Sequence, residues 1–130
     1  MNTAPVKTFN REKGSVGETI ATAFLIKHGF HLVEMNYKNK IGEIDIIAKK
    51  KNARTGENVL HFIEVKYRTT LDYGGGRESV GIAKQNKIRK VAQGYLGEKR
   101  LYDNVSISFD VIDIVGSPHD HEIEHLEGCF

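Results

Sequence analysis

Two segments of the chain carry apolar residues at the three- and four-residue spacing of a helix. In residues 15–28 these positions are followed by Gly29, a suitable C-terminal stop, and Ser15 is a suitable N-cap. Residues 80–97 repeat the pattern and leave three lysines outside the apolar side. We therefore predict a helix over each segment.

The segments between and after these helices have the composition of β-strands. Residues 41–48 and 59–68 are rich in β-branched residues, and the polar stretch between them predicts an antiparallel hairpin. Apolar and polar residues alternate over 105–111, which indicates a half-buried strand, and 30–35 is a shorter β-prone run. The order helix, three strands, helix, strand predicts an α/β fold, a mixed β-sheet flanked by α-helices.

Length and composition fit one globular domain. At 130 residues and 39% hydrophobic, the chain can bury a core without disulfides. We expect a flexible segment over 1–14, the folded domain over 15–116 and a polar tail over 117–130. The only cysteine, Cys129, falls in what we expect to be a frayed end. Without a signal peptide or a long apolar run, we expect a cytoplasmic protein that does not contact a membrane.

Charge is distributed unevenly, although the formal net charge is only +2. Basic residues outnumber acids in 37–54 and in 77–100, whereas 102–130 contains acids but no Lys or Arg. This asymmetry suggests that the middle of the chain meets a polyanion. Solvated basic faces with no partner explain the charges equally well.

Acids and a lysine lie inside two of the predicted strands. Side chains alternate faces along a strand, so Glu64 and Lys66 share one side of 59–68. Asp45 lies among isoleucines in 41–48, a strand with little access to water. Because a hairpin folds one strand back on the other, we expect Asp45, Glu64 and Lys66 to converge.

This set of groups suits phosphodiester hydrolysis with a hard metal ion. Asp45, Glu64 and the backbone carbonyl of Val65 offer the oxygen ligands that Mg²⁺ prefers, with Mn²⁺ as a substitute. The metal would lower the pKa of a bound water, while Lys66 orients the nucleophile or stabilises the transition state. The alternative is structural: a buried salt bridge between Lys66 and one carboxylate.

The order of these motifs resembles a known group of nucleases. GEIDIIA followed by HFIEVKYR resembles the signature of the PD-(D/E)xK nucleases, an acid and then Glu-x-Lys. That group includes restriction enzymes and archaeal Holliday-junction resolvases. The closer resemblance is to the YraN family of small bacterial proteins, predicted nucleases of undefined role. It covers nearly the whole chain, from GSVGETIATAFLIKHGF and Asn36 to SVGIAKQNKIRKVAQGYL and SFDVIDI.

The resemblance implies a restriction-endonuclease-like core and a fourth site residue. It makes Asp45, Glu64 and Lys66 the catalytic set and adds Glu18, on the first helix, as a further catalytic acid and metal ligand. The residues alone favour another role for Glu18. Ser15 to Glu18 has the pattern of a capping box, in which the Glu18 side chain bonds back to the Ser15 backbone. The basic stretch KKKNARTGEN is longer than is usual in the family, and we assign it no role.

Several further residues have both a functional and an ordinary explanation. Lys84, Gln85, Lys87 and Lys90 on the second helix, together with Arg68, would contact DNA phosphates or form an ordinary solvated face.

The last two features carry weaker signals. GGGR, residues 74–77, lacks the phosphate-loop pattern, and we interpret it as a loop on the substrate side. The tail histidines fit no closed zinc pattern, so we expect a tail that is solvated or adds a strand. We assign no role to the three of them: His119, His121 and His125.

We therefore expect a Mg²⁺-dependent endonuclease that hydrolyses DNA phosphodiester bonds, and the resemblance suggests branched, Holliday-junction-like DNA as the substrate. One domain presents one active site, so cutting both strands requires a homodimer. The alternative is a nucleic-acid-binding accessory protein of DNA repair, recombination or uptake that does not cleave.

Overall fold

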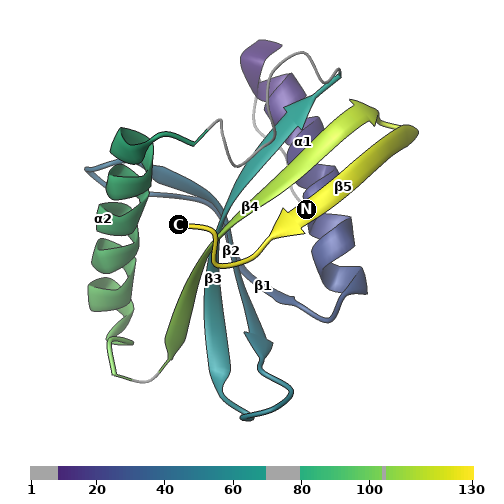
Figure 1. Ribbon diagram of the computed structural model, residues 1–130. Coiled ribbons are helices and arrows are strands. Elements are labelled where there is room, and N and C mark those ends of the chain that lie inside the picture. The colour runs from purple at the N-terminus through teal and green to yellow at the C-terminus, as the bar shows by residue number, and fades with distance from the viewer. Residues whose placement is uncertain (1–8, 70–79, 104) are drawn as a thin grey trace, which may run out of the picture.

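The described part of the chain, residues 9–69, 80–103 and 105–130, forms two helices and five strands in the computed structural model (Figure 1). No helix in these ranges is long and apolar enough to cross a membrane. The GGGR segment lies outside the described residues. The elements in chain order are α1 (Phe9–Lys27), β1 (His31–Lys38), β2 (Glu43–Lys51), β3 (Asn58–Arg68), α2 (Ile82–Lys99), β4 (Ser106–Ser117) and β5 (Asp120–Leu126).

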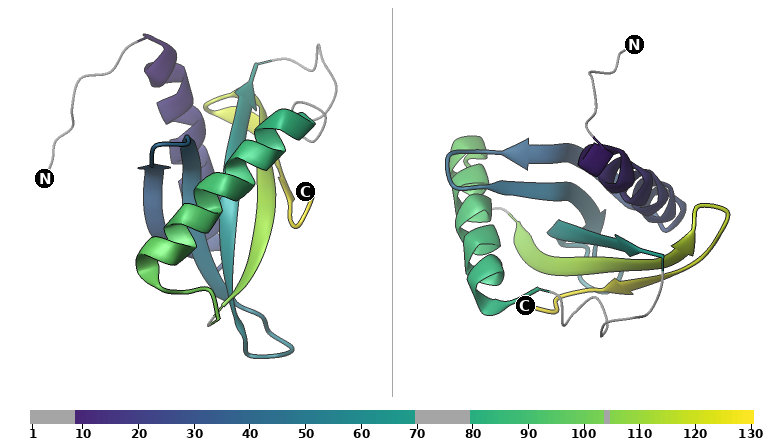
Figure 2. Two further views of the ribbon diagram at one scale, coloured as in Figure 1. Left: turned by 90° about the vertical axis from the view of Figure 1, so that its left-hand side faces the viewer. Right: turned by 90° about the horizontal axis from the view of Figure 1, so that it is seen from above.

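The five strands form one sheet in the order β1-β2-β3-β4-β5. Neighbouring strands are antiparallel except for β3 and β4, which run parallel from Val59 opposite Ser106 to Arg68 opposite Val115. A parallel pair needs a crossover, and α2 provides it (Figure 2). The mixed sheet predicted from the sequence is confirmed.

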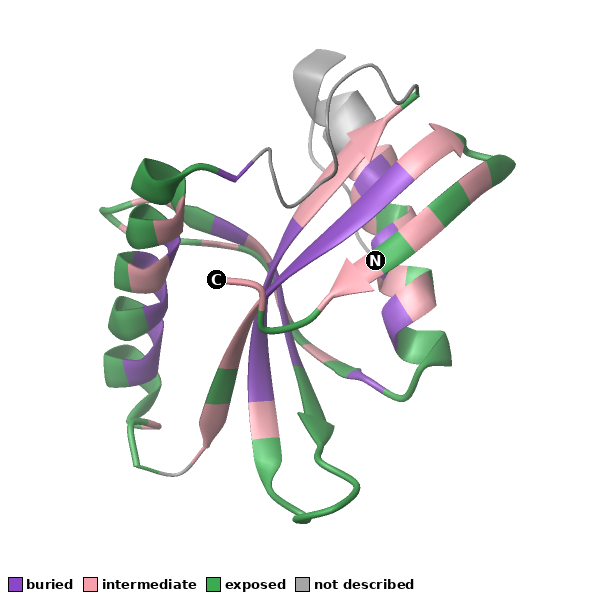
Figure 3. Ribbon diagram, in the orientation of Figure 1, coloured by how far each residue is buried: buried purple, intermediate pink, exposed green. Residues whose placement is uncertain are grey.

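A helix covers each face of the sheet. One core cluster joins α1 to Ile46 and Ile63, and the other joins α2 to Ile47 and Phe62. These neighbours fall in different clusters because successive side chains of a strand point to opposite faces. Figure 3 shows the buried residues of α2 on the side that faces the sheet. The predicted flanking helices are therefore confirmed.

The first helix begins earlier than the sequence pattern indicated. α1 starts at Phe9, so Ser15 lies inside the helix and is not its N-cap. The preceding residues Arg11, Glu12 and Lys13 are good helix formers, which lets the helix extend toward the N-terminus. The predicted capping box is therefore wrong, and with it the structural explanation for Glu18.

The C-terminal region is more regular than the sequence suggested. β4 continues to Ser117, and β5 pairs with it antiparallel, so the alternative of an added strand is correct. Partly buried positions alternate with exposed glutamates along β5, but among them only Ile123 and the terminal Leu126 are apolar, which left the pattern weak. The predicted frayed end at Cys129 is wrong, because its backbone N–H donates to the carbonyl of Phe109 at 2.9 Å.

Candidate active site

The candidate site lies where β2 and β3 part. The last register pair between them is Ile46 with Ile63. Beyond this pair the backbone N–H of Val65 donates to Asp45 Oδ2 at 2.8 Å. An acidic side chain thus replaces the partner that a continued ladder would supply. This bond fixes the Asp45 carboxylate beside the segment of β3 that carries Glu64.

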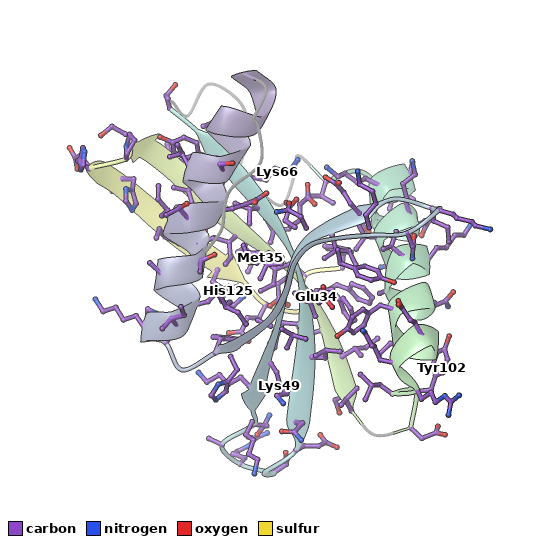
Figure 4. The ribbon with its side chains drawn as sticks, turned by 180° about the vertical axis from the view of Figure 1, so that it is seen from behind. Glu34, Met35, Lys49, Lys66, Tyr102 and His125 are labelled. Carbon is purple, nitrogen blue, oxygen red and sulfur yellow. The ribbon has the colours of Figure 1, made fainter. Side chains whose placement is uncertain are left out.

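Glu64 is the central acid of the site and is only 8% exposed. Its Oε2 lies 3.5 Å from Nζ of Lys66 and 2.5 Å from Nζ of Lys84. The first lysine shares a face of β3 with Glu64, as predicted from strand alternation, and the second reaches it from the first turn of α2. Two cations therefore meet one buried carboxylate (Lys66 is labelled in Figure 4).

Glu18 approaches the site from α1. Its Oε1 accepts a hydrogen bond from Nδ2 of Asn36 at 3.1 Å. The helix lies close to β3 at this level: a Cβ atom on Gly17 would be 2.8 Å from Cβ of Tyr67. The small residue before Glu18 thus permits the close approach that brings the carboxylate toward Asp45.

The three carboxylates influence one another. Burial raises the pKa of Asp45 to about 7, and the negative charges of Glu64 and Glu18 contribute to the rise. The Val65 N–H and the Lys84 ammonium oppose it. Burial is thus the main reason that the ionised form of Asp45 is disfavoured, and the neighbouring carboxylates add to it.

Lys84 is electrostatically coupled to the acids. Burial lowers the pKa of its ammonium, but the hydrogen bond and charge of Glu64 and the charge of Asp45 outweigh this effect, so its pKa lies above the ordinary value. The sequence placed Lys84 only among residues for DNA phosphates. The structure places it within the site, a contact between α2 and β3 that no local pattern could reveal.

The other residues predicted for nucleic-acid binding lie around the site rather than in it. Arg68 donates to both carboxylate oxygens of Asp113, at 3.0 and 3.3 Å. Gln85 Nε2 donates to the carbonyl of Val80 at 2.9 Å. Lys87 and Lys90 are exposed on α2.

A second cluster of polar groups lies on β3, β4 and β5. Asp110 Oδ2 accepts from His61 Nδ1 at 2.7 Å and from His125 Nε2 at 2.8 Å, while Oδ1 accepts from Ser108 Oγ and the Gly128 N–H. Burial would raise the pKa of Asp110, but these hydrogen bonds hold it well below its usual range. The cluster is a hydrogen-bonded network, and it gives His125, to which we assigned no role from the sequence, a contact with Asp110.

This network also differs from the predicted metal site in its geometry. Within the described residues, His61, Asp110 and His125 are the three side chains of metal-binding type whose ligand atoms all lie within 4.8 Å of one another. In the same described part of the chain, Glu18, Asp45 and Glu64 do not form such a group. No local pattern predicts the network, since its members are brought together by pairing of three strands.

Comparison with known proteins shows which family the chain belongs to. The model of the uncharacterised protein family UPF0102 matches residues 17–114. The chain belongs to family UPF0102. Within it, the chain is 38% identical over 127 residues to a UPF0102 protein of Clostridium botulinum (strain Alaska E43 / Type E3), covering 96% of this chain and 98% of the relative. A UPF0102 protein of Dictyoglomus turgidum (strain DSM 6724 / Z-1310) is 42% identical over 123 residues, with 93% and 98% covered.

The family match confirms the resemblance found in the sequence, because UPF0102 is the YraN family. The matched range includes the four predicted catalytic residues: Glu18, Asp45, Glu64 and Lys66. The names of these UPF0102 proteins state no activity. A function must therefore be argued from the chemistry of the site.

Proposed function

We propose that this chain is a metal-dependent endonuclease that hydrolyses DNA phosphodiester bonds. The main support is the meeting of Asp45, Glu64 and two lysines at the point where β2 and β3 part. Acids buried beside cations are costly to keep for stability alone, so their collection at one opening of the sheet favours a functional role.

The donor set fits Mg²⁺ or Mn²⁺. Asp45, Glu64 and Glu18 would hold the ion, together with the carbonyl of Val65, and all of these are hard oxygen donors. Burial, and after it the charges of Glu64 and Glu18, raises the pKa of Asp45, and a bound divalent cation would favour the ionised carboxylate. A bound ion would supply an activated water and neutralise charge on the phosphate.

The two lysines of the site are suited to bind a phosphate group of the DNA. Lys66 lies on β3 beside Glu64, where its ammonium can orient a nucleophile or contact a phosphate oxygen. Lys84 adds a second positive charge from another element. Placing cations on both α2 and β3 allows a phosphate group to be held from two sides.

A non-cleaving nucleic-acid-binding protein is the second candidate. It is favoured by one observation: the two lysine ammonium groups already neutralise Glu64, the residue that a metal ion would need. In such a protein the same cations would bind phosphates without hydrolysis.

The deciding experiment is a cleavage assay on linear duplex, single-stranded and four-way-junction DNA. Each is incubated with the purified chain and Mg²⁺, Mn²⁺ or chelator. We expect metal-dependent cleavage that Glu64→Gln lowers by at least about a hundredfold, since it removes a metal ligand. Faster cleavage of the junction would support branched DNA as the substrate.

Glu124→Gln is the matched control, because Glu124 is an exposed acid on β5. It should cleave like the wild type. If the wild type and Glu64→Gln leave every substrate equally intact, the nuclease proposal fails. Binding without cleavage would then favour the second candidate.

A further inference from the structure

The end of β2 and the turn that follows it display four cations. Lys49, Lys50, Lys51 and Arg54 are all exposed. Within the described residues, none of the four makes an ion pair, whereas Lys66 and Lys84 of the site are both paired with Glu64. The hairpin itself contributes one acid, Glu57. Apart from Lys50, which donates to the carbonyl of His28, these cations remain available to an outside partner.

Neutral groups hold this turn in shape. Asn52 Oδ1 accepts from the N–H groups of Arg54 and Thr55, at 2.8 and 3.1 Å, and the Asn52 N–H donates to the carbonyl of Glu57 at 2.8 Å. Gly56 adopts φ of +74°, which closes the turn. The cations are thus carried on a preformed hairpin, which lowers the entropic cost of binding a partner through them.

Two hollows flank the hairpin and share its lysines. One, of about 350 Å³, is lined by Lys50, Lys51 and Arg54 together with His61. The other, of about 790 Å³, is lined by Lys49, Lys50, Lys51 and His31. Basic residues thus outnumber acids around both recesses, since Glu127 is the one acid in their lining, and both recesses are large enough to admit a phosphate group.

We propose that this basic hairpin, residues 49–57, binds the phosphate backbone of the nucleic acid at a place separate from the candidate active site. The proposal rests on the proposed function for its partner, DNA. Figure 4 shows Lys49 and Lys66 toward opposite ends of the sheet. Lys51 is in register with Asn58, six residues before Glu64, so about 20 Å of strand separates Lys51 from the central acid.

This separation matches a length of duplex. At 3.4 Å per base pair, 20 Å corresponds to about 6 base pairs. A duplex whose phosphate is bound at the candidate active site therefore reaches Lys51 only when it extends about 6 base pairs or more beyond that phosphate. The hairpin would add affinity for longer arms without contacting the reacting group.

Nucleic acid fits this surface better than a membrane does. A membrane-binding hairpin combines basic residues with large apolar side chains that enter the lipid. The stretch KKKNARTGEN contains Ala53 as its one apolar residue and no aromatic residue. A row of cations with almost no apolar residues among them is suited to a polyphosphate backbone.

The test measures DNA binding by the full chain in chelator, so that no cleavage occurs. Lys51→Gln/Arg54→Gln removes two hairpin charges, while Lys50, which donates to the carbonyl of His28, is kept. For a duplex of about 16 base pairs, the slope of log affinity against log salt should fall by about 2. The affinity loss between 50 and 200 mM salt should accordingly shrink about tenfold.

Lys99→Gln/Arg100→Gln is the charge-matched control, since both residues are exposed and lie at the C-terminal end of α2, outside the hairpin. It should leave the slope unchanged. Equal slopes for the wild type and the hairpin variant on the long duplex would overturn the proposal.

The outcome separates this proposal from the nuclease proposal. If the wild type cleaves DNA and the hairpin variant binds DNA as the wild type does, only the proposal for the hairpin is overturned. If the hairpin variant binds DNA more weakly but the wild type does not cleave, the proposal for the hairpin is supported and the nuclease proposal is contradicted. Hairpin-dependent binding to vesicles of anionic lipid, with none to DNA, would overturn the choice of nucleic acid.

Discussion

At the scale of single residues, the buried carboxylate of Glu64 is the centre of the candidate site. Strand alternation places Glu64 and Lys66 on one face of β3, and the hairpin brings Asp45 beside them. Lys84 could not be assigned to the same carboxylate, because the contact depends on how α2 docks over the sheet. The pattern within one strand or helix predicts which face each side chain occupies. A contact between elements that are distant in the sequence depends on the tertiary structure.

The raised pKa of Asp45 makes stability depend on pH. The folded protein keeps the proton up to about pH 7, whereas an unfolded Asp loses it near pH 4. The stabilisation is thus present at low pH and is lost as pH rises through 7. Asp45→Asn, which can still accept from Val65, should be more stable than the wild type above pH 7 by about 1–3 kcal/mol.

Urea unfolding at pH 5 and pH 8 measures this effect. The wild type should lose stability between the two values more steeply than Asp45→Asn does. Mg²⁺ should restore part of the wild-type stability at pH 8 and have no such effect on the variant. Parallel pH curves for the two proteins would refute the raised pKa of Asp45.

Lys84 competes with a metal ion for Glu64. Its ammonium lies 2.5 Å from the carboxylate, so a cation that binds Glu64 must displace or share this contact. We expect Lys84→Met to bind Mg²⁺ more tightly by about tenfold but to cleave DNA more slowly, because a charge that contacts the phosphate is lost. Calorimetric titration and single-turnover rates measure the two effects separately.

A weaker metal affinity in Lys84→Met would contradict this competition. Lys87→Met is the control, because Lys87 is an exposed lysine on the same helix. It should leave the Mg²⁺ affinity unchanged.

At the scale of elements, periodicity predicted most helices and strands but not their limits. Strong apolar patterns defined β2, β3 and α2, whereas β5 is formed mainly of charged residues and histidines. Its place is secured by pairing with β4 and by His125, which reaches Asp110 across the sheet. The sequence separates these two residues by 15 positions, so no local pattern predicted their contact.

The spacing between α1 and β3 is set by Gly17. Gly17→Ala would place a Cβ 2.8 Å from the Tyr67 Cβ, so the helix must shift and carry Glu18 with it. We expect a loss of stability of about 1–3 kcal/mol and weaker Mg²⁺ binding. Gly94→Ala is the matched control, because its new methyl group meets only the tip of the Asn39 side chain. Thermal unfolding and metal titration of both variants provide the check.

The network of Asp110 ties three strands together. Asp110→Asn retains the shape but leaves the two histidine donors and the other N–H and O–H groups facing a weaker acceptor. We expect a loss of about 2–4 kcal/mol at neutral pH. Because the pKa of Asp110 is lowered, its contribution is present above about pH 4 and is lost as pH falls further.

Denaturant unfolding from pH 7 to pH 2.5 measures this contribution. The difference between the wild type and Asp110→Asn should shrink at the acid end. Asp120→Asn, an exposed acid at the start of β5, serves as the control and should change little at any pH. A constant difference across the range would show that the charge of Asp110 is not what holds the strands.

At the scale of the whole molecule, one domain carries one candidate site. The acids and lysines of that site come from α1, β2, β3 and α2 of a single chain, so one copy can carry out one cut. The two strands of a duplex run in opposite directions, and a symmetric pair of sites is the simplest device for cutting both. We therefore propose that double-strand cleavage requires a homodimer.

Supercoiled plasmid distinguishes one cut from two. If single copies act independently, nicked circles accumulate first and linear DNA follows in a later step. If a dimer acts, linear DNA should form with little nicked intermediate, and its rate should rise with about the square of protein concentration below the dimer dissociation constant. Light scattering over the same concentrations should then show the mass of two chains. A monomeric mass together with linear DNA formed directly would contradict this link between dimerisation and cleavage, because one site would then have cut both strands without a partner.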